Sequence, residues 1–316
     1  MSNKVVFYCD IDSTSGLGHI ARCKTISKIL RKKGFYSYLI VDKINQEVAI
    51  SLFQKYFDLI YEKDTFMSLK LKNLILFIDS YKLSINDELF NTGWEKIVII
   101  RDMATPKFDA NYYLNQFVGS NHELDNFQTQ VFCPIVDPIY YQIGAARIEK
   151  EFDEVKQILV FGGGSKSSNF VANVYSKLKL IDKSFNCILL TNNSINVSDK
   201  RFTVQKLKLN FHRLLKDSDT VISTAGSVLW ELLAAKRIIG VAMEASNQFQ
   251  NYQFVLKNSL GLKIGEKNND LWEIDLKSMN TLFFEPRERK KLFYSTDFNS
   301  ELINSEKLIE VIDKFI

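Results

Sequence analysis

A histidine that directly follows a glycine-rich segment is the residue in this sequence whose position most favours catalysis. The segment runs from Asp10 to His19, reads D-I-D-S-T-S-G-L-G-H, and follows the apolar run Val5–Cys9. Gly16 and Gly18 let backbone N–H groups approach an anion, and a helix that begins here adds positive potential. That potential favours the neutral imidazole that a general base requires. In the competing interpretation, Asp10 and its neighbours form only a polar helix cap.

A second segment, Ser223–Glu231, has the same plan of a strand, small residues and a helix. It reads S-T-A-G-S-V-L-W-E. The N–H groups around Gly226 and the hydroxyl of Ser227 suit a diphosphate, and the Glu231 carboxylate can accept two hydrogen bonds from ribose. A serine N-cap followed by a carboxylate, as in a capping box, explains Glu231 equally well. Both interpretations stay open.

Two further loops carry groups that can bind a polar ligand. The loop Glu244–Asn251 contains Asn247 and Gln248, whose amides can donate to and accept from sugar hydroxyl or acetamido groups. The alternative is an ordinary hydrophilic loop before a helix. A glycine turn in the second half of the chain either contacts a phosphate or packs tightly, and it contains Gly163, Gly164 and Ser165.

Short apolar runs alternate with helical patterns along the whole chain, which is typical of parallel βαβ units. The plan of strand, glycine turn and helix occurs twice and predicts an α/β fold of two Rossmann-like domains, residues 1–150 and 151–316. Their parallel sheets should face a central cleft, and Asp79–Tyr81 should reach it from the end of a strand. The predicted strands include Val5–Cys9, Tyr36–Val41, Leu74–Ile78, Lys96–Ile100, Tyr112–Asn115, Gln157–Phe161, Cys187–Thr191, Thr220–Ser223 and Ile238–Ala242.

Composition excludes several classes of protein. The 316 residues contain 41 Lys and Arg against 37 Asp and Glu, spread without a basic domain, so a nucleic-acid partner is not expected. Four cysteines without a CxxC pair and three histidines argue against a zinc site and favour a reducing cytoplasm. No run approaches the roughly 18 uncharged apolar residues of a membrane span. We expect a cytoplasmic protein without metal or cofactor that touches membranes at most at their surface.

A set of motifs resembles one family. D-I-D-S-T-S-G-L-G-H-I-A-R-C resembles the first loop and helix of the PseG/SpsG-like proteins, whose members include the UDP-sugar hydrolases of the pseudaminic acid pathway. The other matching segments follow in the family's order: Ile78–Leu83, Asp102–Gln116, Ile158–Ser165, Asp219–Glu231 and Asn247–Gln248.

The resemblance implies the GT-B fold, no metal, and hydrolysis of UDP-2,4-diacetamido-2,4,6-trideoxy-β-L-altropyranose, with inversion, by water attacking the anomeric carbon. It implies that His19 is the base for this water. Motifs and resemblance together give Asp10, Gly16, Gly18, Tyr81, Asn247 and Gln248 as candidate substrate-binding residues. The candidate nucleotide-binding residues are Gly163, Gly164, Ser165, Gly226, Ser227 and Glu231.

Three places depart from the family pattern, one of which is Ala225–Val228, where the family often has G-G-S-T. Tyr8 stands where many relatives carry an arginine, and Arg101 stands where the family has the first aspartate of an Asp-Asp pair. If His19 deprotonates a sugar hydroxyl instead of water, the same scaffold is an inverting glycosyltransferase for surface glycans, such as a nonulosonyltransferase. A nucleotide-sugar-binding subunit without catalysis is the third interpretation. The sequence leaves open the sugar, UDP against CMP, the acceptor and the oligomeric state.

Overall fold

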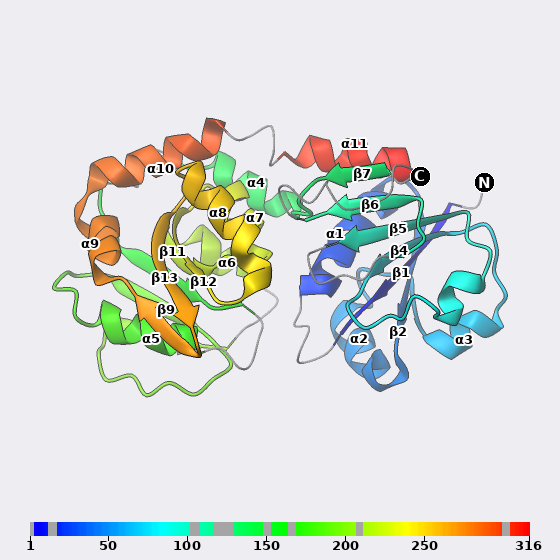
Figure 1. Ribbon diagram of the computed structural model, residues 1–316, viewed down its shortest axis with the longest axis horizontal. Coiled ribbons are helices and arrows are strands. Elements are labelled where there is room, and N and C mark those ends of the chain that lie inside the picture. The colour runs from blue at the N-terminus through cyan, green and yellow to red at the C-terminus, as the bar shows by residue number, and fades with distance from the viewer. Residues whose placement is uncertain are drawn as a thin grey trace. The chain divides into compact units, whose positions relative to one another are not determined.

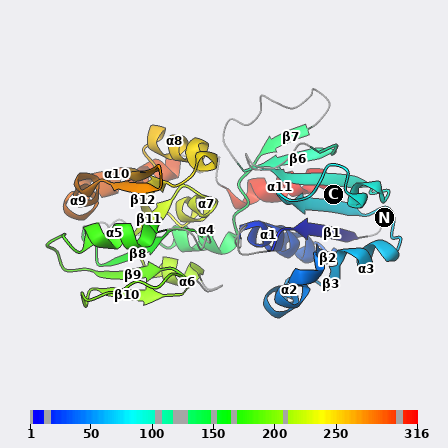
Figure 2. The ribbon, with the colours of Figure 1, turned by 60° about the horizontal axis from the view of Figure 1, so that its bottom comes forward.

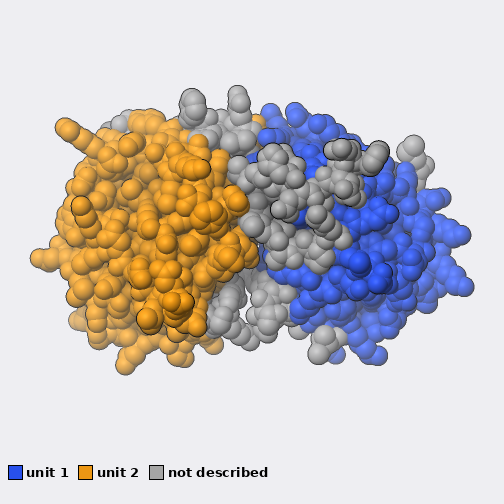
Figure 3. All heavy atoms as spheres, viewed as in Figure 1, with its two compact units in different colours: residues 1–135, 306–316 blue, residues 136–305 orange. Residues whose placement is uncertain are grey.

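The computed structural model describes residues 3–11, 18–101, 108–116, 129–147, 153–163, 169–206, 211–298 and 304–316. The chain forms two compact units, residues 1–135 with 306–316 (unit 1) and residues 136–305 (unit 2), coloured separately in Figure 3. Each unit contains one seven-stranded sheet and the helices that cover it (Figure 1). The predicted α/β fold of two Rossmann-like domains is therefore confirmed.

Unit 1 is a parallel sheet of strand order β3-β2-β1-β4-β5-β6-β7. The order reverses direction between β1 and β4, and such switch points are where open α/β sheets bind ligands. Its strands are β1 (Lys4–Cys9), β2 (Tyr36–Val41), β3 (Leu59–Glu62), β4 (Ile75–Asp79), β5 (Lys96–Arg101), β6 (Tyr112–Asn115) and β7 (Thr129–Phe132). Its helices are α1 (Gly18–Lys32), α2 (Gln46–Phe53), α3 (Lys63–Ser68) and α11 (Ser305–Phe315), with short 3₁₀ turns η1 (Lys43–Asn45) and η2 (Glu88–Asn91).

Helix α1 forms because its apolar residues recur at helical spacing. Ile20, Cys23, Ile26 and Leu30 are fully buried against the sheet. The helix ends with Arg31 and Lys32 in its last turn, where cations stabilise the C-terminal end of the helix dipole. Its first residues, which directly follow the glycine-rich segment, are therefore held rigidly at the carboxyl edge of β1.

The C-terminal helix α11 belongs to unit 1, which differs from the predicted division at residue 150. Leu308, Val311, Ile312 and Phe315 lie in the same apolar cluster as the buried residues of α1, and Figure 2 shows α11 alongside the strands of unit 1. The other boundary lies between residues 135 and 136, because α4 (Pro138–Ala145) contacts α7 (Val228–Ala234) of unit 2. The chain thus passes from one unit to the other twice.

Unit 2 repeats the plan with strand order β10-β9-β8-β11-β12-β13-β14 and a switch point between β8 and β11. All neighbouring strands are parallel except β13 and β14, which are antiparallel. The strands are β8 (Gln157–Phe161), β9 (Asn186–Leu190), β10 (Phe202–Gln205), β11 (Thr220–Thr224), β12 (Ile238–Met243), β13 (Leu262–Asn268) and β14 (Leu271–Ile274). The remaining helices are α5 (Phe170–Leu178), α6 (Phe211–Lys216), η5 (Ser246–Gln248), α8 (Phe249–Lys257), α9 (Leu276–Phe284) and α10 (Pro286–Phe298).

Candidate functional site

A buried network of three charged or polar side chains lies at the switch point of unit 1. His19 Nδ1 on α1 is 2.5 Å from Oδ1 of Asp79, the last residue of β4. Arg22, one helical turn after His19, contacts both oxygens of the same carboxylate, with Nε 2.6 Å from Oδ2 and a terminal nitrogen 2.7 Å from Oδ1. The exposed fractions are 2% for His19, 7% for Arg22 and 1% for Asp79. Helix α1 thus brings two basic side chains to one carboxylate.

The network fixes the charge of Asp79 and the tautomer of His19. Burial alone would raise the pKa of Asp79, but the Arg22 guanidinium and His19 outweigh burial and hold that pKa at about 2. An ionised carboxylate only accepts hydrogen bonds, so Nδ1 of His19 carries the proton in this pair. The backbone oxygen of Asp79 also lies 3.0 Å from Nδ1. When the imidazole is neutral, its lone pair is therefore at Nε2, which is the tautomer required of a base oriented by a carboxylate.

We predict that Asp79 makes the stability of the protein depend on pH at the acid end. Its pKa is about 2 in the folded chain and its ordinary value is 3.8. Because the folded pKa is the lower one, the ionised carboxylate stabilises the fold fully above about pH 4, and this contribution is lost as the pH falls toward about 2. The loss should amount to about 2 kcal/mol and should be absent in Asp79→Asn. Urea unfolding over that pH range measures this loss. If the unfolding free energy of Asp79→Asn depends on pH as that of the unmodified chain does, the pH dependence does not come from Asp79.

Asp10 and Tyr81 occupy the same edge as His19. The Asp10 carboxylate, 4% exposed, accepts a hydrogen bond of 2.7 Å from the Ser80 hydroxyl and one of 2.8 Å from the backbone N–H of Tyr81. The Tyr81 ring lies edge-on to the His19 ring, with centroids 4.4 Å apart. Asp10 therefore positions the loop after β4, and this loop places Tyr81 beside the imidazole.

The structure brings together three of the residues predicted for this site, namely His19, Asp10 and Tyr81. Gly18 is the first residue of α1, and Gly16 lies outside the described residues. The imidazole is more enclosed than the sequence suggested, because its ring is held between the Asp79 carboxylate and Tyr81.

Three loops meet at the switch point of unit 2, because β8, β11 and β12 are neighbours. Gly163, after β8, has a φ of +90°, which side-chain-bearing residues rarely adopt, and a Cβ placed there would lie 3.9 Å from Oγ1 of Thr224. A Cβ on Gly226, after β11, would lie 3.8 Å from Nε2 of Gln248, after β12. The candidates Gly163, Gly226 and Gln248 thus share one edge; Gly164 and Ser165 lie outside the described residues.

The capping-box interpretation of Glu231 is not what the structure shows. Ser227 precedes α7 but has αR backbone angles and no side-chain hydrogen bond to the helix, and its side chain is exposed. Glu231 instead accepts a hydrogen bond from the buried Tyr140 hydroxyl of α4, and burial together with this carboxylate raises the pKa of Tyr140 well above its usual value. The serine hydroxyl is therefore not used to close the helix.

The loop after β12 contains buried polar atoms without partners. Gln248 Oε1 accepts a hydrogen bond of 2.9 Å from the backbone N–H of Glu244. Asn251, 1% exposed, reaches the Ala225 carbonyl at 3.5 Å, so α8 contacts the loop after β11. Oδ1 of Asn247 and Oδ1 of Asn251 are buried and have no hydrogen-bond partner within the described parts of the chain. Buried acceptors of this kind are usually satisfied, which favours a ligand here.

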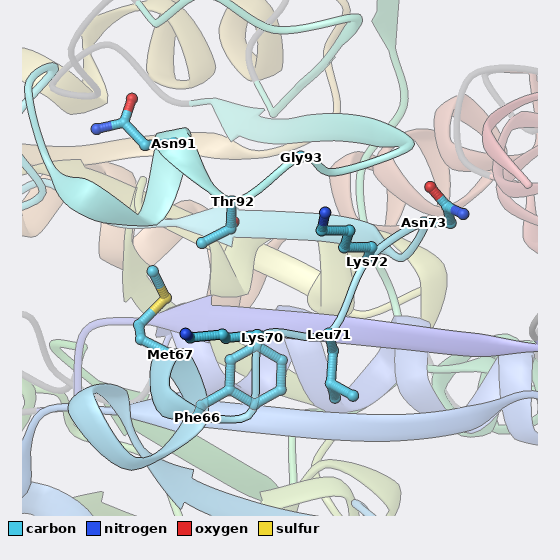
Figure 4. Close-up of a pocket in the computed structure, with 9 residues that line it drawn as sticks. All are labelled: Phe66, Met67, Lys70, Leu71, Lys72, Asn73, Asn91, Thr92 and Gly93. Carbon is cyan, nitrogen blue, oxygen red and sulfur yellow. The ribbon is translucent and has the colours of Figure 1, made fainter.

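A surface pocket of about 560 Å³ lies away from these edges. Its lining, shown in Figure 4, comes from α3 with the segment before β4 and from the turn before β5. It is therefore at the amino edge of the unit 1 sheet, opposite the edge that holds His19. Its residues are Phe66, Met67, Lys70, Leu71, Lys72, Asn73, Asn91, Thr92 and Gly93.

Two further findings bear on cofactors and membranes. Within the described ranges, no three His, Cys, Asp or Glu side chains come together in a way that could hold a metal ion. None of the helices that the structure describes is both long and apolar enough to cross a bilayer.

The fold is shared with solved glycosyltransferases. A UDP complex of UGT89C1 from Arabidopsis thaliana superimposes with a TM-score of 0.68 at 12% identity, covering 98% of this chain and 99% of that one. MurG of Acinetobacter baumannii gives a TM-score of 0.64 at 14% identity, with coverage of 98% and 99%. This likeness confirms the expected GT-B fold of two Rossmann-like domains.

Comparison of sequences gives less information about the family than comparison of folds. An uncharacterized protein of Methanocaldococcus jannaschii, MJ1062, is 24% identical over 284 residues, which is 80% of this chain and 58% of that protein. This chain therefore spans less than two thirds of the length of that relative. No family model matches the chain. The solved structures show the GT-B fold alone, and membership of the PseG/SpsG-like family stays a prediction.

Some residues of the site were missed by sequence reasoning. In the sequence, Arg22 was interpreted only as part of a helix. Its position one helical turn after His19 is the signal that both side chains lie on the same face and can contact the same partner. Tyr140 carried no motif, and Asn251 ended the predicted polar loop Glu244–Asn251 without a role of its own. Their roles depend on contacts with Glu231 and Ala225, which are 91 and 26 residues away in the chain.

Proposed function

We propose that the chain is an inverting glycosyltransferase that uses a nucleoside-diphosphate sugar and employs His19 as general base. The observation that carries this proposal is the 2.5 Å contact between His19 Nδ1 and the ionised carboxylate of Asp79. This contact fixes the imidazole tautomer whose Nε2 can take a proton. The shared fold with UDP-binding glycosyltransferases supports it independently.

In this mechanism Nε2 of His19 removes a proton from the acceptor hydroxyl as its oxygen attacks the anomeric carbon. The bond to the nucleoside diphosphate breaks on the opposite face, so the configuration inverts. The imidazolium that forms is stabilised by the Asp79 carboxylate, which stays ionised because Arg22 holds its pKa low. General-base catalysis of this kind contributes about 10²–10⁴-fold to the rate.

The loops of unit 2 supply the groups that would hold the donor. Gly163 and Gly226 lie at the carboxyl ends of two neighbouring strands, where backbone N–H groups can approach a diphosphate. Asn247 and Gln248 offer amides for sugar hydroxyls, and Glu231 offers a carboxylate for ribose. These roles agree with the positions that the sequence motifs predicted.

Hydrolysis is the second candidate, and the burial of His19 favours it. An imidazole that is 2% exposed has little room beside it for a large acceptor, whereas water fits. The motif resemblance points to a UDP-2,4-diacetamido-2,4,6-trideoxyhexose of the pseudaminic acid pathway as the substrate of such a hydrolase. The base and the inversion are the same in both reactions; only the nucleophile differs.

Release of UDP from a panel of UDP-sugars, with and without added acceptor sugars, separates the candidates. The panel includes UDP-N-acetylglucosamine and the UDP-altrose derivative. Release that requires an acceptor supports the transferase, and release into buffer alone supports the hydrolase. Binding of UDP without any release would contradict both and leave a non-catalytic binding subunit.

We predict that Glu231→Ala weakens UDP binding more than it slows turnover at saturation. The reason is that the Ser227 side chain does not cap α7 and that a carboxylate with one hydrogen bond from Tyr140 keeps acceptor capacity for ribose hydroxyls. Calorimetric titration with UDP measures the change, which should be about 10-fold. Tyr140→Phe is the matched control, since it keeps the carboxylate and removes its internal partner. Unchanged UDP affinity in Glu231→Ala would exclude the role in nucleotide binding.

Ser227→Ala separately tests the capping alternative. A lost N-cap hydrogen bond costs about 0.5–2 kcal/mol of stability. Because the Ser227 side chain makes no such bond, we expect the free energy of unfolding to change by less than about 0.5 kcal/mol. A larger loss of unfolding free energy, measured by urea unfolding, would show that Ser227 does cap α7.

A further inference from the structure

We propose that the surface pocket at the amino edge of the unit 1 sheet binds a phosphate monoester with an apolar substituent, held by Lys70 and Lys72. The pocket has a volume of about 560 Å³, within the range of about 300–1,000 Å³ that small-molecule sites occupy. It lies at the edge opposite His19, and none of the residues proposed for catalysis or nucleotide binding lines it. The inference therefore adds a second site and does not depend on the proposed function.

The lining of the pocket carries two positive charges and no negative one. It contains Lys70 and Lys72 and neither Asp nor Glu. Both lysines are exposed, and their ammonium groups have no ion pair or hydrogen bond within the described part of the chain. Lys63 of α3, by contrast, is paired with Asp87 at 2.6 Å. A phosphate monoester carries about 1.5–2 negative charges at neutral pH, so it matches the two ammonium groups.

The two lysines face a further hydrogen-bond donor across the pocket. In Figure 4, Lys72 extends from the segment before β4 toward Thr92, and Lys70 extends toward Met67. Asn91 lies on the same side of the lining as Thr92. Its exposed amide makes no hydrogen bond to the residues that the structure describes. An amide N–H group can donate to a phosphate oxygen, so Asn91 can add to the contacts of the lysines.

An apolar part of the lining is already held in place. The Phe66 ring is 3% exposed and stacks on Trp94, with centroids 6.1 Å apart and an interplanar angle of 9°. Tyr61 meets Phe66 edge-on at 5.7 Å. Met67 and Leu71 are half-buried and line the pocket with it. An alkyl or aryl group of a ligand would cover this apolar surface, which inorganic phosphate leaves in contact with water.

The backbone at Lys70 allows a variant that removes its charge without straining the fold. Lys70 directly follows Leu69, the C-cap of α3, and has a φ of +48°. Glycine is the usual residue at this position after a helix because it adopts the left-handed region without a steric penalty. Lys70→Gly should therefore fold at least as well as the unmodified chain.

Titration of the full chain with phenyl phosphate tests the proposal. UDP is added in excess first, so that the loops proposed to bind its diphosphate are occupied. Inorganic phosphate, which lacks the ring, and phenol, which lacks the charge, are the matched probes. We expect phenyl phosphate to bind about 10-fold more tightly than either probe, because only phenyl phosphate uses both parts of the lining. Calorimetry measures the three affinities.

Variants assign the binding to this pocket. Lys70→Gly and Lys72→Gln should each weaken phenyl phosphate binding by about 5-fold, the upper end of what an exposed charge pair contributes. Lys200→Gln removes an exposed lysine of unit 2 that does not line the pocket and should change nothing. Circular dichroism of the three variants checks that each is folded.

Vesicles distinguish a soluble phosphate ester from a lipid headgroup. Phosphatidylcholine vesicles with and without phosphatidate, whose headgroup is a phosphate monoester, are sedimented with the chain. Sedimentation that requires phosphatidate and is lost when Lys70→Gly and Lys72→Gln are combined assigns the pocket to a lipid phosphate. Binding of phenyl phosphate without such sedimentation assigns it to a soluble ester.

Two results would overturn the phosphate site. In the first, phenyl phosphate binds no more tightly than inorganic phosphate, and phosphatidate vesicles capture no more protein than neutral ones. In the second, Lys70→Gly and Lys72→Gln bind the probes as Lys200→Gln does. Both results leave the transferase proposal standing, because that proposal is tested by the release of UDP.

Discussion

His19→Ala is expected to lower the turnover number by about 10²–10⁴-fold while the affinity for UDP stays nearly unchanged. In the proposed mechanism the imidazole takes the proton from the nucleophile, and its Nδ1 is already held by Asp79. The loops that we propose to bind the nucleotide belong to unit 2 and do not include His19. Steady-state release of UDP measures the rate, and calorimetric titration measures the affinity.

His212→Ala is the matched control, because it removes a histidine from α6 of unit 2, outside the proposed catalytic network. It should keep the turnover of the unmodified chain. If His19→Ala retains full turnover, the imidazole is only a structural link between α1 and β4. If it loses UDP affinity and turnover equally, the residue acts through the fold and not through the chemical step.

Asp79→Asn is expected to damage both activity and stability. The amide keeps the shape of the side chain but loses the charge that fixes the His19 tautomer and stabilises the imidazolium. The buried Arg22 guanidinium also loses its partner, and removing one member of a buried pair costs about 3–5 kcal/mol. We expect turnover to fall about as far as in His19→Ala and the unfolding free energy to fall by that amount.

An exposed ion pair serves as the control for the buried pair between Asp79 and Arg22. Asp313→Asn breaks the pair between Asp313 and Lys33, which joins α11 to the end of α1 at the surface. Exposed pairs contribute about 0–1 kcal/mol, so this variant should be nearly as stable as the unmodified chain and fully active. Equal losses of stability in the two variants would contradict the central role of the Asp79 network.

The strands that could be predicted from sequence are those buried on both faces. Val5–Cys9 and Ile238–Ala242 are continuous apolar runs, and they lie within β1 and β12 with boundaries that differ by one residue. The partly exposed strands β3, β10 and β14 mix polar and apolar residues and were not predicted, because neither periodicity nor composition distinguishes them from loops.

The position of the last helix shows a second limit of sequence reasoning. The apolar face of Leu308, Val311, Ile312 and Phe315 predicts a packed helix, and the structure has this face in a core. It does not predict which unit provides that core. The choice depends on contacts such as that between Phe315 and Tyr112, whose ring centroids are 4.9 Å apart. Such pairs are about 200 residues apart in the chain and leave no local signal in the sequence.

For the candidate site, sequence predicted the residues carried by loops and missed those that position them. His19 directly follows a glycine-rich segment and Gly226 stands in a glycine-containing turn, and both features are visible in the sequence. The function of Asp79 as the partner of His19 depends on the pairing of β1 with β4, which only the fold establishes. The role of Arg22 follows from the same pairing, since its partner is 57 residues away.

A crystal structure of the protein with UDP and an acceptor sugar tests the central claim most directly. We expect Nε2 of His19 to lie about 2.6–3.2 Å from a hydroxyl oxygen of the acceptor, or from a water in its place, with Nδ1 still bonded to Asp79. An imidazole that remains enclosed between Asp79 and Tyr81, with no sugar oxygen or water in contact with Nε2, would contradict it.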